Sequence, residues 1–97
     1  MRYVNLDASR MTDVETVHQY IAEQFGIRPY GASLDDMLLT LVSLKYEYLV
    51  KIKNAEMLDI YLGEYGKVLI DVLGIARDIN RLLHIRFLWE IDKTRLY

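Results

Sequence analysis

Three short segments of the chain alternate apolar and polar residues with a period of two. Residues 2–7 place Val4 and Leu6 on one side, and residues 46–53 repeat the pattern. A last segment, residues 84–91, alternates in the same way. Its expected inward residues are Ile85, Phe87, Trp89 and Ile91. Because successive side chains of a strand point to opposite faces, each segment predicts a strand with one buried and one wet face.

Between the first two strands, apolar residues recur at the spacing of amphipathic helices. Thr12 and Glu15 have the spacing of a capping box, which predicts a helix start, and Gly26 is the expected stop. A loop then leads to a second helix, expected at residues 33–44, with Ser33 as its N-cap.

Two more helices are expected between the second and third strands. Asn54 is the expected N-cap of a short helix, and Gly66 precedes a longer helix at residues 67–82. Gly74 lies in the middle of this longer helix, where it marks a close backbone approach to another helix or to a partner. The expected buried face of the longer helix consists of Val68, Leu69, Val72, Ile75, Ala76, Ile79 and Leu82.

The predicted order is therefore β-α-α-β-α-α-β, within a single domain that spans residues 1–97. Strands separated by helices favour parallel pairing through right-handed crossovers. We expect an α/β fold of two layers, with a three-stranded parallel sheet and about four helices, most of them on one face of the sheet.

Composition narrows the class of protein. The chain is 53% apolar, which supports a buried core, and it has no cysteine, which fits a reducing compartment; we expect the cytoplasm. No stretch has the length and apolar content of a signal peptide or a membrane span. The net charge of −2 shows no excess of the basic residues that bind nucleic-acid phosphates, so we do not expect nucleic acid as a partner.

The most informative segment is residues 29–41, PYGASLDDMLLTL. A Tyr-Gly turn leads to Ser33, and Asp35 and Asp36 follow in the first helical turn. Asp36 has the spacing that completes a cap with Ser33, whereas Asp35 lies off the apolar stripe and is not needed for the cap. The pattern predicts a rigid helix start that carries an exposed carboxylate.

This segment resembles the barstar family of intracellular ribonuclease inhibitors. Tyr30, Gly31, Leu34, Asp35 and Leu41 stand where the family motif has them. The His-Gln pair at residues 18–19, the chain length and the order of elements also agree, so the resemblance covers most of the chain and includes a barstar-like fold.

The resemblance implies a mechanism. In the family, this loop and helix plug the active site of a ribonuclease, where carboxylates replace RNA phosphates among basic side chains. The implied partner is a protein, a basic ribonuclease, which residues 29–46 would enter with Asp35. The candidate partner-binding residues are Tyr30, Gly31, Asp35, Leu39, Val42 and Tyr46.

The chain departs from the family pattern at positions that matter. Leu39 replaces the second carboxylate of the motif, Pro29 replaces the first loop tyrosine and Ser33 replaces an asparagine. A carboxylate of the later long helix has no clear match near Gly74. The alternative reading is therefore a barstar-fold interaction module whose partner is not a nuclease. Leu39 itself either packs under a neighbouring loop or forms an exposed apolar anchor with Tyr30 and Val42.

The sequence gives little support for catalysis, metal binding or RNA binding. The chain lacks a cysteine nucleophile and a phosphate-binding glycine loop, so we expect no enzyme activity, small-molecule substrate or cofactor. His18 and His84 lack metal-ligand spacing, and each is expected to be hydrogen-bonded or solvated. RNA binding on the wet sheet face would use Lys51, Lys53, His84 and Arg86, but Tyr3 is the one outward aromatic available for stacking.

Overall fold

The strands form one parallel sheet, in the order β1-β2-β3. The computed structural model describes residues 1–31 and 33–89. Its strands are β1 (Arg2–Asp7), β2 (Tyr48–Lys53) and β3 (Leu83–Phe87), and both neighbouring pairs are parallel. This confirms the predicted α/β architecture.

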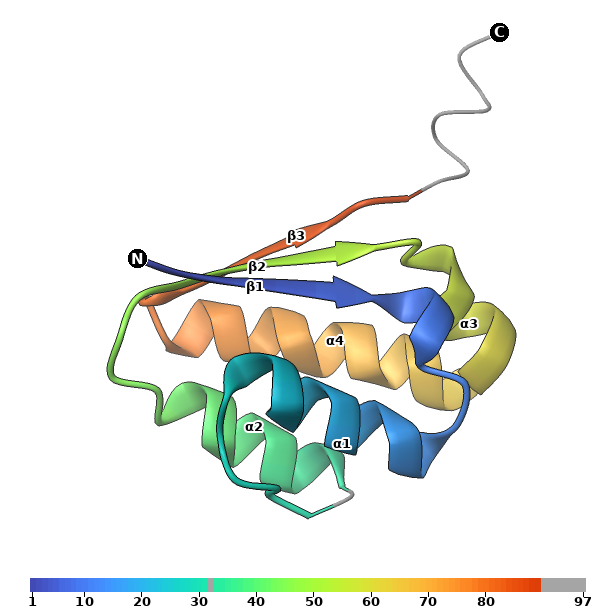
Figure 1. Cartoon of the computed structure of the whole chain (residues 1–97), viewed down its shortest axis with the longest axis horizontal. Helices are drawn as coiled ribbons and strands as arrows, with labels where there is room; N and C mark the ends of the chain where they lie inside the picture. Colours follow the sequence, from blue (N-terminus) through green and yellow to red (C-terminus); the bar gives the residue numbers. More distant parts are fainter. Residues whose placement is uncertain (32, 90–97) are drawn as a thin grey trace, which may run out of the picture.

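The helices lie on one side of the sheet (Figure 1). They are α1 (Val14–Phe25), α2 (Leu34–Val42), α3 (Glu56–Leu62) and α4 (Glu64–Ile79), with a 3₁₀ turn, η1 (Ala8–Arg10), after β1. Helix α1 contacts β1, α4 contacts β3, and α2 packs against α4. Among the described residues, no helix is both long enough and apolar enough to cross a lipid bilayer.

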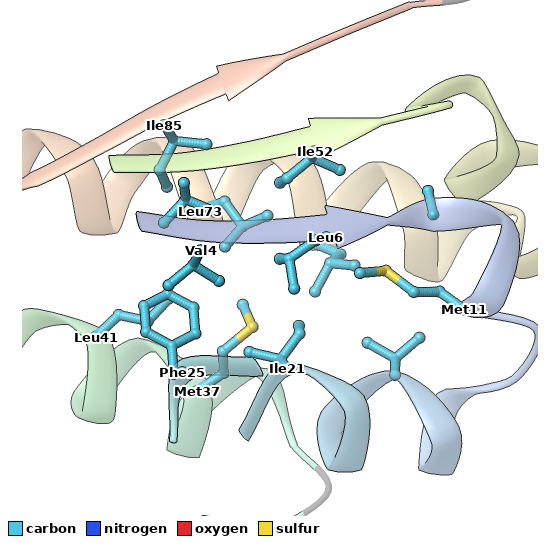
Figure 2. Close-up of a cluster of buried hydrophobic side chains, with 14 of the residues drawn as sticks. Val4, Leu6, Met11, Ile21, Phe25, Met37, Leu41, Ile52, Leu73 and Ile85 are labelled. Atoms are coloured by element: carbon cyan, nitrogen blue, oxygen red, sulfur yellow. The ribbon is translucent and has the colours of Figure 1, made fainter. Parts of the chain in front are cut away.

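The core fills the space between the sheet and these helices. Val4 and Leu6 of β1 lie close to Ile21 of α1 and to Met37 and Leu41 of α2 (Figure 2). Each is at most 4% exposed. Burying side chains of this size contributes roughly 1.5–3 kcal/mol each, so the inward rows of the strands hold the helices in place.

The outward rows of the strands face solvent, as the alternation predicts. Tyr3 is 69% exposed. Asn5, Lys51 and Arg86 are also exposed, and the strand register places them directly beside one another across the sheet. Lys53 lies next to Asp7, with 3.9 Å between Nζ and Oδ2. The open face of the sheet is thus polar and mostly cationic.

Several predicted boundaries are wrong by a few residues. Helix α2 ends at Val42 rather than residue 44, and β2 begins at Tyr48 rather than residue 46. Strand β3 starts one residue early and ends at Phe87, although half-buried Trp89 still packs against the core as predicted. The predicted strand end at Ile91 lies outside the described residues.

Two predicted caps are also wrong. Asp13, not Thr12, is the N-cap of α1, and its Oδ1 accepts a hydrogen bond from the backbone N–H of Thr16 at 2.9 Å. Asn54 does not cap α3. It adopts a left-handed conformation with φ of 56°, and its Nδ2 donates to Oδ1 of Asp7 at 3.0 Å. Asn54 therefore ties the end of β2 to the end of β1.

Helix α4 begins at Glu64, so Gly66 lies inside the helix rather than before it. Its buried residues are Gly66, Leu69, Leu73 and Ala76. The predicted buried face was correct for Leu69 and Ala76 but wrong for four exposed residues: Val68, Ile75, Ile79 and Leu82. Helix α4 has two apolar rows, and the predicted face combined residues of both.

The two glycines of α4 have different surroundings. A Cβ atom added to Gly66 would lie 2.0 Å from the backbone oxygen of Leu58 in α3, so Gly66 is where the two helices approach closely. A Cβ atom added to Gly74 would meet only a guanidinium nitrogen of Arg77, at 3.8 Å. The predicted approach of another helix at Gly74 is therefore wrong.

This difference predicts opposite effects of the same substitution. Gly66→Ala should lower the free energy of unfolding by about 1–3 kcal/mol, because α3 and α4 must move apart. Gly74→Ala should raise it by about 0.5–1 kcal/mol, because alanine favours the helix and nothing obstructs it. Urea denaturation of both variants measures the effects. A Gly66→Ala protein as stable as the wild type would contradict the close approach.

Candidate functional site

Helix α2 starts with the predicted cap. The backbone N–H of Asp36 donates to Oγ of Ser33 at 3.1 Å, and the Ser33 hydroxyl donates to Oδ2 of Asp36 at 2.8 Å. The Asp36 carboxylate is thus engaged within the cap. Such caps contribute about 1 kcal/mol to helix stability and fix the direction of the first turn.

Gly31 has a structural reason to be glycine. Its φ is +100°, and an added Cβ atom would lie 2.7 Å from Oδ2 of Asp36. The loop before α2 therefore packs directly against the Ser33–Asp36 cap. Any side chain at this position would strain the backbone and push Asp36 away from Ser33.

Asp35 points away from this closed turn. Its side chain is exposed, and it makes no hydrogen bond or ion pair with another described residue. Leu39 lies one turn further along the same side of α2 and is 64% exposed. The reading in which Leu39 packs under a loop is therefore wrong. Val42, the next residue on this side, is half-buried against the core.

Tyr30 is held inward rather than presented as a free anchor. Its ring is half-buried, and its hydroxyl lies 2.7 Å from Nδ1 of His18 in α1. The rings of Tyr30 and His18 meet edge to face, with centroids 5.4 Å apart. The expectation that Tyr30 adds an exposed anchor beside Leu39 is not met, because its polar end bonds to the molecule's own interior.

His18 connects the loop to α4 as well. Its Nε2 lies 2.5 Å from the hydroxyl of Tyr65, so one imidazole bridges two tyrosines. His18 is 2% exposed, and burial lowers its pKa, although the nearby Asp36 carboxylate opposes that shift. Burial also raises the pKa of Tyr30 and of Tyr65. A neutral imidazole donates to one hydroxyl and accepts from the other, so the three groups satisfy one another.

The far end of α2 is fixed by a different buried polar group. Nδ2 of Asn80 donates to the carbonyl oxygens of Leu41 at 2.9 Å and Leu44 at 3.1 Å. These carbonyls lie at and just beyond the C-terminal end of α2, where the regular hydrogen bonds of the helix run out. Asn80 is 8% exposed, so its bonds join α2 to the end of α4 in a buried place.

The remaining predicted site residue, Tyr46, lies beyond the C-terminal end of α2, away from Asp35. It is 61% exposed, and the Arg2 guanidinium lies 4.1 Å from its ring centroid. Tyr46 is thus available to a partner, but the structure gives it a stacking contact of its own.

The site offers little for small ligands. A hollow of about 200 Å³ beside the loop is lined by Glu15, His18, Gln19, Pro29 and Gly31. Within residues 1–31 and 33–89, no group of His, Asp or Glu side chains has the arrangement to hold a metal ion. The other histidine, His84, bonds to the Glu47 carboxylate at 2.9 Å.

The buried imidazole predicts a pH dependence of stability. Burial disfavours the protonated form of His18 in the folded chain, whereas the unfolded chain binds a proton near the ordinary pKa of 6.5. Stability should therefore be fully present above pH 6.5 and fall as the pH drops below it, with a slope of up to about 1.4 kcal/mol per pH unit. Urea denaturation between pH 7.5 and 5 measures this slope.

Two variants isolate the contribution of His18. His18→Gln should be less stable at pH 7.5 but should lose less further stability towards pH 5. Gln24→Ala, at an exposed position of α1, changes no titratable group and should keep the wild-type slope. The lowered pKa values of Asp7 and Asp13 affect stability only below their ordinary value of 3.8, outside this window. An unchanged slope in His18→Gln would contradict the role of this bridge.

Comparison with known proteins assigns the chain to a family. No curated protein matches the sequence. The family model described as Barstar (barnase inhibitor) matches residues 1–90, which is nearly the whole chain and includes the entire candidate site. The chain therefore belongs to the Barstar (barnase inhibitor) family.

Proposed function

We propose that this chain inhibits a ribonuclease by docking residues 29–46 into the basic active site of the enzyme. The observation that carries the proposal is Asp35, an exposed carboxylate without a partner on a capped helix. In this role Asp35 takes the place of an RNA phosphate and accepts charge-assisted hydrogen bonds from Arg or Lys side chains.

The rigid support of α2 favours such a role. Ser33 fixes its first turn, His18 holds the preceding loop through Tyr30, and Asn80 fixes its last turn. A surface that is already ordered loses little conformational freedom on binding, so more of the contact energy appears as affinity.

The family description supports a protein-binding role for the chain. The basic ribonuclease as target, the identity of that enzyme and a cytoplasmic location are further parts of our proposal. The lack of cysteine is consistent with the reducing conditions of the cytoplasm.

A second candidate function is binding to a protein that is not a nuclease. The exposed Leu39 favours it, because an apolar residue at the centre of the helix face suits a partner without a dense cluster of cations.

An inhibition assay tests the first candidate. Purified ribonucleases, barnase among them, are assayed on RNA with increasing amounts of the chain. We expect inhibition of at least one enzyme, and Asp35→Asn should weaken it by about 10- to 100-fold, because a charge-assisted contact is lost. The matched control Glu23→Gln removes an exposed carboxylate from α1 and should inhibit like the wild type.

The outcomes separate the two candidates. Failure to inhibit any enzyme tested would contradict ribonuclease inhibition and favour the second candidate. Inhibition that Asp35→Asn leaves unchanged would instead show that the docking surface lies elsewhere on the chain. Urea denaturation of each variant establishes that the folded state is retained.

A further inference from the structure

We propose that the open face of the sheet is a second docking surface, which binds a short acidic segment of a partner protein. This surface, which we call the sheet surface, consists of Tyr3, Leu49, Lys51, Arg86 and Leu88. The segment carries two neighbouring carboxylates with apolar side chains beside them. The inference goes beyond the proposed function, because α2 lies in the helical layer on the other face of the sheet (Figure 1).

The centre of the sheet surface is a pair of like charges. The strand register places Lys51 of β2 directly beside Arg86 of β3, and we call these two residues the cation pair. Both are exposed, and neither makes a hydrogen bond or ion pair with another residue of the ranges 1–31 and 33–89. Neighbouring strands lie about 4.8 Å apart, and like charges directly opposite destabilise a sheet. A carboxylate bound between the two side chains would remove this repulsion.

Apolar residues flank the cation pair along the strands. On one side, the register pairs exposed Tyr3 with half-buried Leu49. On the other side lies Leu88, which is 45% exposed and continues the alignment of β3, because its backbone N–H donates to the carbonyl of Ile52 at 2.8 Å. Parallel sheets are ordinarily covered on both faces, so apolar groups left exposed on an open face indicate a surface that a partner can cover.

A hollow beside Leu49 gives this surface relief. Its volume is about 420 Å³, and its lining includes Leu49, His84 and Arg86, together with Arg77 of α4. Guanidinium groups bind carboxylates through charge-assisted, often paired, hydrogen bonds. A bound segment could therefore place an apolar side chain against Leu49 and a carboxylate against Arg86.

Two acidic residues limit the kind of anion that fits. The Glu47 carboxylate bonds to His84 at 2.9 Å at one end of the face, and Asp7 lies 3.9 Å from the Lys53 ammonium at the other end. Both carboxylates would repel a long polyanion, whereas a short acidic segment over the cation pair avoids them. RNA recognition on a sheet also needs several exposed aromatics for stacking, and the sheet surface offers Tyr3 alone. The surface therefore favours a protein segment over RNA.

A peptide selection tests the sheet surface. A phage-displayed library of short random peptides is selected on the immobilised wild-type chain, and the affinities of the selected peptides are then measured on variants. We expect peptides in which two or more Asp or Glu residues stand beside apolar residues. Lys51→Gln and Arg86→Gln should each weaken binding by about tenfold, because each removes a charge-assisted contact. Arg86→Lys keeps the charge and should weaken binding less.

The matched control is Arg28→Gln, which removes an exposed cation between α1 and α2. It changes the net charge by the same amount and should leave the peptide affinities unchanged. Urea denaturation gives a second readout. Lys51→Gln and Arg86→Gln should be at least as stable as the wild type, because each relieves the repulsion within the cation pair. A clear loss of stability in both variants would show that the two cations support the fold, which would overturn the inference.

The remaining outcomes are equally decisive. If the selected peptides are not acidic, or if they bind Lys51→Gln and Arg86→Gln as tightly as Arg28→Gln, the inference fails. A single-stranded RNA of similar length is titrated in parallel, and tighter binding of this RNA through the cation pair would assign the surface to nucleic acid instead. None of these results depends on Asp35. Failure to inhibit any ribonuclease would therefore contradict the proposed function without affecting this test.

Discussion

The structure depends on burying one face of a short parallel sheet. Inward residues such as Val4, Val50 and Ile85 must be covered, and right-handed crossovers bring both pairs of helices to the same face. The helices then share a limited surface. Helix α2 packs mainly against α4, so one side of α2 remains turned to solvent. Asp35 and Leu39 are exposed because the helices share one face of a three-stranded sheet, which leaves this side of α2 uncovered.

Much of this arrangement could be predicted from the sequence because the signals are local. The alternation of the strands, the cap formed by Ser33 and Asp36, and the exposure of Asp35 each depend on residues within one or two turns of one another. Element order and parallel pairing followed from the spacing of the strands. The match of the family model to residues 1–90 agrees with the resemblance carried by the same short motif.

The errors arise where distant residues or two equivalent patterns decide the outcome. Asn54 bonds to Asp7 and His18 bonds to Tyr65, each across 47 positions, and no local pattern indicates such pairs. Helix α4 carries two apolar rows, and only contact with the sheet and α2 shows which is buried. Gly66 and Gly74 look alike in sequence, yet only Gly66 meets another backbone.

The open face of the sheet has a consequence for how copies of the chain meet. Lys51 stands directly beside Arg86, and like charges at such close range repel, so this face resists stacking against its counterpart on another molecule. Within the described residues, β1 and β3 each pair on one side only, which leaves backbone groups free at both margins. Self-association through the sheet would therefore begin by strand addition at these margins. High ionic strength would weaken the repulsion between the open faces of two molecules.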